Sequence, residues 1–163
     1  MFNNYLNNYE YLNNFDYINL CLKMITNNPL NLQYIENPSL TVIEEALKNN
    51  GLALQYLNEQ NENLCLLAIQ ENGLALKYVK NQNKELCINA VQKNGLALQY
   101  VVTKTNYICS EAIKQNSEAI KFINNPNDDL IILSLKNNIN NSRFIQNNKK
   151  KYYYYFMIRF NFI

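Results

Sequence analysis

The sequence predicts an all-α protein, an α-solenoid built from six helix-turn-helix repeats of 22 residues. Residues 94–101 read Asn-Gly-Leu-Ala-Leu-Gln-Tyr-Val and recur almost unchanged at 72–79 and 50–57, so the copies are 22 residues apart. A fixed period of this length is typical of stacked repeat proteins. Within each period, apolar residues recur at steps of three and four, which is the spacing of an amphipathic helix.

Residues 1–16 are expected to form an N-terminal capping helix. Its apolar side chains recur at steps of three and four, and its other face is rich in asparagine. The first cap of a solenoid needs such an apolar inner face and a polar outer face. A frayed, partly ordered terminus is the alternative. The apolar residues are Phe2, Tyr5, Leu6, Tyr9, Leu12 and Phe15.

Residues 17–148 divide into six repeats without insertion: 17–38, 39–60, 61–82, 83–104, 105–126 and 127–148. Within a repeat we number the positions from 1 to 22. Positions 4, 5, 8 and 9 are apolar or small and form one stripe, so they predict a first helix of about ten residues. Position 1 supplies residue types that favour helix N-caps, namely Ser39, Asn61, Asn83, Thr105 and Asn127.

A second, shorter helix is expected after position 12, which is asparagine in every repeat. Pro29 follows Asn28 directly, as proline does at the first position of a helix, so each Asn is expected to cap this helix. In three repeats a glycine follows and would ease the chain reversal. Positions 15, 18 and 19 are expected to face the core, with an aromatic residue always at 18, so Tyr78→Ala should destabilise more than Lys77→Ala.

A leucine-rich repeat of one strand and one helix is the rival architecture, because Leu96, Leu98 and Tyr100 alternate. Helix-forming Ala, Leu, Gln and Lys favour two helices instead. The sixth repeat places Asn140, Asn141 and Ser142 where apolar residues are usual, as expected where no further repeat stacks. Residues 149–163 form a basic and aromatic tail outside the repeat, expected to fold over the open end or to be poorly ordered.

Composition narrows the function. The chain of 163 residues has 48 % hydrophobic residues, a net charge of +2 and no histidine, which removes most metal sites and histidine-dependent catalysis. Residues 1–104 carry seven Lys/Arg and nine Asp/Glu, whereas residues 105–163 carry eight and four. No basic leader with an apolar core and no apolar run of about 20 residues is present. We therefore expect an intracellular, cytoplasmic protein without a membrane segment.

The four cysteines all fall at position 5, which is isoleucine in the other two repeats. Such a column indicates a small buried apolar site rather than a metal site or a disulfide. The acidic residues of the first helical turns, such as Asp128 and Asp129, suit helix N-termini. No catalytic motif is present, so no catalytic, cofactor-binding or metal residue is predicted.

The polar columns at positions 10 and 17 are the candidate interaction surface, with a plain solvated face as the alternative. Both columns become more basic toward the C-terminus. The candidate residues are Gln55, Lys77, Gln99, Lys114, Lys121, Lys136 and Arg143.

Residues 86–101 read Leu-Cys-x-x-Ala-Val-x-x-Asn-Gly-Leu-Ala-Leu-x-Tyr-Val. This segment resembles the repeat of domain-of-unknown-function family 4116, which is common in giant DNA viruses of protists. The resemblance covers about residues 17–146 and is strongest in repeats two to five. The family has no established activity, so the resemblance implies no site residues.

The expected function is therefore that of a non-enzymatic repeat scaffold for protein–protein interaction, without a cofactor. Its partner would be a host or viral protein of unknown identity, and the sequence leaves the oligomeric state open. A virion or structural protein and an RNA-binding helical repeat protein are the alternatives. The modest charge and the uniformity of the columns argue against nucleic acid.

Overall fold

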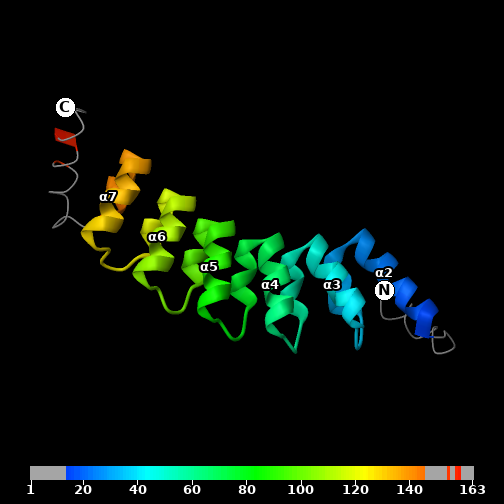
Figure 1. Ribbon diagram of the computed structural model, residues 1–163. Helices are drawn as coiled ribbons and strands as arrows, with labels where there is room; N and C mark the ends of the chain where they lie inside the picture. The colour runs from blue at the N-terminus through cyan, green and yellow to red at the C-terminus, as the bar shows by residue number, and fades with distance from the viewer. Residues whose placement is uncertain (1–13, 146–153, 155–156, 159–163) are drawn as a thin grey trace. The chain divides into compact units, whose positions relative to one another are not determined.

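The computed structural model describes residues 14–145, 154 and 157–158, and between 14 and 145 it contains only helices and the turns between them (Figure 1). The predicted all-α solenoid is confirmed, and no strand occurs in the described part of the chain. The expected capping helix lies almost entirely outside the described residues. The C-terminal tail does so too, apart from Tyr154, Met157 and Ile158.

Each repeat contributes one α-helix followed by one six-residue 3-10 helix (η). The α-helices α3 to α7 have ten residues each, as predicted, whereas α2 has 14 and begins before repeat 1. The elements are α2 (Asn14–Asn27), η1 (Pro29–Tyr34), α3 (Leu40–Asn49), η2 (Gly51–Tyr56), α4 (Glu62–Glu71), η3 (Gly73–Tyr78), α5 (Lys84–Lys93), η4 (Gly95–Tyr100), α6 (Asn106–Gln115), η5 (Ser117–Phe122), α7 (Asp128–Asn137) and η6 (Ile139–Phe144).

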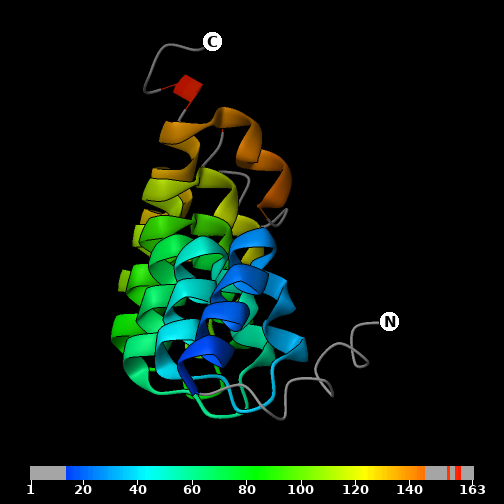
Figure 2. The ribbon, with the colours of Figure 1, turned by 90° about the vertical axis from the view of Figure 1, so that its right-hand side faces the viewer.

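The helices form two compact units, Met1–Lys80 and Asn81–Ile163, which we call the N-terminal and the C-terminal unit. In the N-terminal unit, α4 packs against α3 and against both η2 and η3. In the C-terminal unit, α6 packs in the same way against α5, α7, η4 and η5. Figures 1 and 2 show this order of helices in each unit as a gradual change of colour.

The α-helices begin where position 1 provides a cap. The side-chain oxygen of Asn83 accepts from the Leu86 N–H at 2.8 Å, and Ser39, Asn61, Thr105 and Asn127 cap their helices in the same way. Before two of these helices the chain turns through a left-handed residue, Asn37 (φ 49°) or Asn125 (φ 55°), each followed by proline. Asparagine is one of the few residues with a side chain that tolerates this conformation.

The asparagine at position 12 acts at both helices, which confirms its predicted role. In repeat 4 the Asn94 N–H donates to the Ala90 carbonyl and closes α5, while its side-chain oxygen accepts from Leu96 N–H at 3.0 Å and starts η4. Extended backbone at Asn94 (φ −150°, ψ 109°) separates the two helices. The same arrangement recurs at Asn28, Asn50, Asn72, Asn116 and Asn138.

The core differs from the prediction in the short helix. Positions 15, 16 and 19 are buried in repeats 2 to 4, as at Ala97, Leu98 and Val101. The aromatic residue at position 18 is only half-buried in repeats 2 to 6, and Tyr34 in repeat 1 is 38 % exposed. The assignment of position 18 to the core is therefore wrong. A 3-10 helix has three residues per turn, so position 18 lies above position 15 but near the helix end, where the ring reaches the surface.

Glycine at position 13 serves a purpose other than the predicted chain reversal. No glycine has a positive φ. A Cβ atom on Gly51 would instead collide with the carbonyl oxygen of Ala68, and one on Gly95 with that of Ala112. The glycine therefore lets the start of a 3-10 helix touch the α-helix of the next repeat within the same unit.

The last repeat replaces a buried alanine pair with a polar one. Where repeats 2 to 5 have alanine at positions 8 and 15, repeat 6 has Ser134 and Asn141, both fully buried. Asn141 Nδ2 donates to Ser134 Oγ at 2.9 Å, and Ser134 Oγ donates to the Ser117 carbonyl at 3.0 Å. Asn141 Oδ1 is buried without a hydrogen-bond partner among the described residues.

Candidate functional site

The seven predicted surface residues are all exposed, and they are spread over both units. Gln55 and Lys77 lie in the N-terminal unit, and the other five lie in the C-terminal unit. The two glutamines fold back onto their own helices. Gln55 Nε2 donates to the Leu52 carbonyl at 3.1 Å, and Gln99 Nε2 donates to the Leu96 carbonyl at 3.0 Å. Each of these two side chains therefore stabilises the 3-10 helix that carries it.

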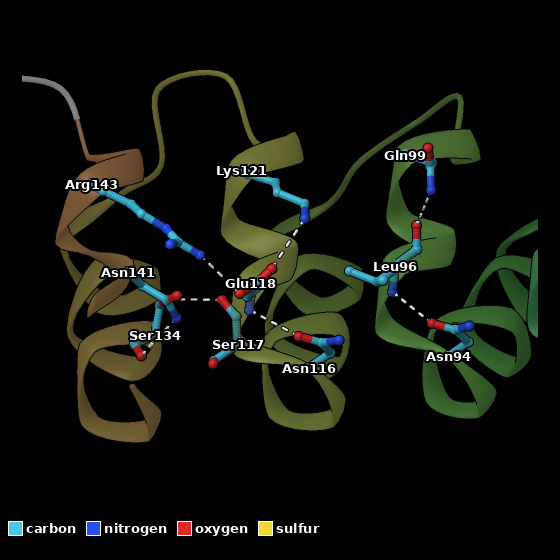
Figure 3. A network of polar contacts seen from close by, with 10 residues as sticks. All are labelled: Asn94, Leu96, Gln99, Asn116, Ser117, Glu118, Lys121, Ser134, Asn141 and Arg143. Carbon is cyan, nitrogen blue, oxygen red and sulfur yellow. Dashed lines mark hydrogen bonds and ion pairs between the residues drawn. The ribbon is translucent and has the colours of Figure 1, made fainter. Parts of the chain in front are cut away.

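The structure brings two of the predicted residues together around a carboxylate (Figure 3). Glu118 accepts from Lys121 Nζ at 3.2 Å and from Arg143 Nη2 at 3.0 Å. Lys121 Nζ lies 5.3 Å from the ring centre of Phe122 and 5.8 Å from that of Phe144, over which the Arg143 guanidinium also lies at 4.6 Å. We call Glu118, Lys121, Phe122, Arg143 and Phe144 the cation–aromatic cluster.

Lys114 belongs to a separate group on the α-helices. Glu111 accepts from Lys114 Nζ at 2.7 Å and from Gln92 Nε2 at 2.8 Å. These hydrogen bonds lower the pKa of Glu111, and the bond to Glu111 raises the pKa of Lys114. The side chain of Lys136 is exposed and makes no hydrogen bond to any described residue. No hydrogen bond or ion pair joins the side chains of these residues to the cation–aromatic cluster within the described part of the chain.

All four cysteines are buried with free thiols, which confirms that position 5 belongs to the core. Burial raises the pKa of Cys65, Cys87 and Cys109. At Cys109, nearby Lys104 partly opposes that rise. No group of three or more potential metal ligands gathers within residues 14–145.

The glutamine at position 22 of repeats 2 and 3 has a role that was not predicted from the sequence. Gln60 Nε2 donates to the Tyr78 carbonyl at 3.0 Å, while Gln60 Oε1 accepts from the Lys80 N–H at 3.1 Å. Gln82 makes the same pair of bonds to Tyr100 (2.9 Å) and Val102 (3.1 Å). Each side chain thus links the end of one repeat to the end of the next.

The thiol at position 5 belongs to this arrangement. Cys65 Sγ donates to Gln60 Oε1 at 3.7 Å, and Cys87 Sγ donates to Gln82 Oε1 at 3.5 Å. The sequence carries a signal for it: cysteine follows five residues after Asp16, Gln60, Gln82 and Lys104, but isoleucine follows five residues after Pro38 and Pro126. Where position 5 is cysteine, the residue five positions earlier is therefore polar, and where position 5 is isoleucine, that residue is proline.

A pocket of about 420 Å³ opens in the C-terminal unit where Lys104 takes the place of the linking glutamine. Both walls come from the ends of consecutive repeats and the start of the following α-helices. The lining includes Val102, Lys104, Cys109, Phe122 and Asn124.

Short α-helices and 3-10 helices that alternate and pack in series define this chain as a helical repeat protein of the solenoid class. Within that class, residues 39–82 and 61–102 match the family described as Domain of unknown function (DUF4116). No curated protein and no solved structure matches the chain. Among the described residues, no helix is both long enough and apolar enough to cross a membrane.

Proposed function

We propose that this chain is a non-enzymatic repeat scaffold that binds a protein partner. The observation that carries the proposal is the cation–aromatic cluster, in which five large side chains from η5 and η6 lie in contact at the surface. Arginine and aromatic residues are enriched in protein interfaces and often dominate their binding energy. Two cations and one carboxylate leave the cluster with a net positive charge, so an acidic partner segment fits it.

The use of the other polar side chains supports a scaffold rather than a catalyst. Asparagines at position 12 cap helices, Gln60 and Gln82 link repeats, and Gln55 and Gln99 bond to their own helices. Such residues stabilise the fold. The variable residues outside these columns would then determine which partner binds. Helical repeats use this division between constant inner positions and a variable surface for recognition.

The proposal includes the cellular setting expected from the resemblance. We propose that the partner is a host or viral protein met in the cytoplasm of a cell infected by a giant DNA virus. A place in the virion, as a structural component, is the alternative setting for the same surface.

Affinity capture with the full chain tests the interaction. The variant Lys121→Glu/Arg143→Glu reverses both cations of the cluster, and exposed ion pairs of this kind contribute little to stability. We expect the wild-type chain to retain proteins that this variant loses, as identified by mass spectrometry. The matched control is Lys23→Glu/Lys93→Glu, which changes two exposed lysines outside the cluster and outside the columns at positions 10 and 17 by the same charge.

The proposal fails if the wild type, the variant and the control retain the same proteins. The proposal also fails if ribonuclease treatment releases all the proteins that the wild type retains and the variant loses, since nucleic acid would then be the ligand. Circular dichroism of the three chains checks that the helices are intact.

A further inference from the structure

The ends of repeats 3 and 4 present a backbone pattern that a carboxamide satisfies. The residue at position 18 offers its carbonyl and the residue at position 20 its N–H, both toward the end of the preceding repeat. Gln60 and Gln82 fill this place, each with its NH₂ group on the carbonyl and its oxygen on the N–H. The thiol at position 5 donates a third bond to the same oxygen.

At the end of repeat 4, this place has no glutamine. The corresponding groups are the Phe122 carbonyl, the Asn124 N–H and the Cys109 thiol, and Lys104 stands at position 22. A lysine ammonium cannot accept a hydrogen bond. Lys104 Nζ instead donates to the Val101 carbonyl of its own repeat at 2.9 Å. None of the three corresponding groups has a hydrogen-bond partner within the part of the chain that the structure describes.

The residues that carry these three groups also border open space. Phe122, Asn124 and Cys109 all line the pocket of about 420 Å³. The end of repeat 1 differs, because Pro38 and Ile43 put hydrocarbon where the amide and the thiol would be. The pocket beside Lys104 therefore keeps the polar pattern of Gln60 and Gln82 without the side chain that fills it.

We propose that this pocket binds the side-chain carboxamide of a glutamine or asparagine from a partner polypeptide. The NH₂ group of the ligand donates to the Phe122 carbonyl, and its oxygen accepts from the Asn124 N–H and from the Cys109 thiol. The chain itself shows this occupant at Gln60 and Gln82, with distances of 2.9–3.1 Å to the backbone. The site shares Phe122 with the cation–aromatic cluster, but it uses the backbone carbonyl of that residue, whereas the cluster uses its ring. The site needs neither Lys121 nor Arg143.

The donor and acceptor pattern selects a carboxamide over a carboxylate. An ionised carboxylate only accepts hydrogen bonds, so one of its oxygens would face the Phe122 carbonyl without a proton between them. Lys104 attracts a carboxylate, but its ammonium is already bonded to the Val101 carbonyl and is exposed to solvent. The Phe122 carbonyl belongs to a half-buried residue and the Cys109 thiol to a buried one, so an unmatched partner costs more there than the solvent-screened charge of the exposed Lys104 returns.

Titration followed by NMR tests the proposal, with the Asn124 amide resonance of the full-length chain as the reporter. The probe is acetyl-Ala-Gln-Ala-N-methylamide, and the same peptide with Glu in place of Gln is the control. We expect the Gln peptide to shift the Asn124 resonance in a saturable way and the Glu peptide to bind roughly tenfold more weakly.

Two substitutions of Lys104 distinguish occupation of the pocket by an amide from the loss of the lysine charge. Lys104→Gln supplies the missing side chain from the chain itself, as at Gln82, and should weaken peptide binding roughly tenfold or more. Lys104→Met removes the charge without supplying an amide and should keep the binding. Lys121→Glu/Arg143→Glu should keep it too, so failure of the cluster and failure of this site are distinguishable.

Three results would overturn the proposal. One is equal binding by Lys104→Gln and wild type, and another is equal binding of the Glu and Gln peptides. The third is the absence of a saturable shift up to about 10 mM peptide, a range that covers weak single-contact binding, since the pocket would then hold only water.

Discussion

Gly51 and Gly95 are residues whose size the packing restricts directly, because a Cβ atom would enter the carbonyl group of the next α-helix. Their N–H groups also donate across the repeats, from Gly51 to Glu71 Oε2 at 2.6 Å and from Gly95 to Gln115 Oε1 at 2.5 Å. The glycine thus combines close contact with a hydrogen bond between repeats.

Gly95→Ala should destabilise the chain by about 1–3 kcal/mol, as overpacking does. Where glycine has an ordinary φ and free space, the same change stabilises by about 0.4–1 kcal/mol, so the sign of the effect tests the contact. Urea denaturation measures the free energy of unfolding. The control is Ser117→Ala at the same position of repeat 5, where a Cβ is already present, and a Gly95→Ala variant as stable as wild type would refute the close contact.

Leu76, Lys77 and Tyr78 differ in burial along one 3-10 helix. Leu76 is fully buried, Tyr78 is half-buried and Lys77 is exposed, with its ammonium 5.3 Å from the Tyr78 ring centre. Leu76→Ala should therefore cost about 2–5 kcal/mol, and Tyr78→Ala roughly half as much. Lys77→Ala should change stability by less than about 0.5 kcal/mol. Thermal unfolding of the three variants should rank their losses of stability in this order. An equal loss of stability for Leu76→Ala and Tyr78→Ala would indicate that the Tyr78 ring belongs to the core.

The burial of single residues was predictable wherever a helical stripe fixed it. Positions 4, 8 and 9 and the Asn caps follow from spacing and residue type, and they were predicted correctly. Position 18 was not, because we expected the ring to face inward with positions 15 and 19, whereas the buried leucine at position 16 takes that place. Aromatic residues carry a large apolar surface, so Tyr100 was expected in the core, although it is only half-buried.

The elements of consecutive repeats are joined by side chains as well as by packing. Gln60 bonds to the backbone of both η2 and the end of η3, through Leu54, Tyr78 and Lys80. Gln55 has the same side chain but bonds only to Leu52 within its own helix. The two glutamines form a matched pair for the effect of a link between repeats.

Gln60→Ala should destabilise the chain by about 1–3 kcal/mol, because it leaves the Lys80 N–H and the Tyr78 carbonyl without their partner. Gln55→Ala should change the free energy of unfolding by less than about 0.5 kcal/mol, since its group is exposed. Chemical denaturation compares them. Equal effects of the two changes would mean that the link between repeats contributes nothing measurable.

The buried pair in the last repeat offers a double-mutant cycle. Ser134→Ala alone removes the 2.9 Å partner of Asn141 Nδ2 and should cost about 1–3 kcal/mol. Ser134→Ala/Asn141→Ala installs the alanine pair of repeats 2 to 5 and should be more stable than either single variant. Unfolding free energies of the four chains give the coupling. Additive losses would show that the two side chains act independently.

At the level of elements, the order of helices and the 22-residue repeat followed from the sequence. The 3-10 geometry did not, because six residues with Ala and Leu suit one short helical form as well as another. The links through Gln60 and Gln82 were also missed, because they join residues 18 and 20 positions apart, and only the pairing of position 22 with cysteine hints at them.

Across the whole molecule, the four thiols report on opening of the fold. Cys21 and Cys65 lie in the N-terminal unit, and Cys87 and Cys109 lie in the C-terminal unit, all buried. Burial raises their pKa, so little thiolate is present at neutral pH, and the thiolate is the reactive form.

In native buffer we expect no thiol to react with Ellman's reagent on the time scale of free cysteine. In increasing urea, the two cysteines of one compact unit should become reactive together, because local opening follows cooperative units. Labelling followed by peptide mass spectrometry assigns each thiol. Rapid labelling of Cys87 or Cys109 without urea would contradict the buried position of that column.

For the candidate site, the sequence identified exposed columns but not which of their members meet. Lys121 and Arg143 meet because Glu118 lies between them, and Glu118 is itself a departure from the leucine found at position 14 in several other repeats. Lys114 shares the charge of these residues but bonds to a carboxylate of its own α-helix. Residues in one column are therefore equivalent in position, whereas their contacts depend on the neighbouring columns.

The Asn caps have a chemical consequence for the lifetime of the chain. Asn50-Gly51, Asn72-Gly73 and Asn94-Gly95 are Asn–Gly sequences, in which the glycine nitrogen of a flexible chain attacks the asparagine amide and forms a succinimide. In the folded chain the nitrogens of Gly51 and Gly95 are bonded to Glu71 and Gln115, and each asparagine oxygen is bonded to the leucine two residues on. We therefore expect the folded state to slow deamidation at Asn50 and Asn94, and chains that open often to accumulate isoaspartate there.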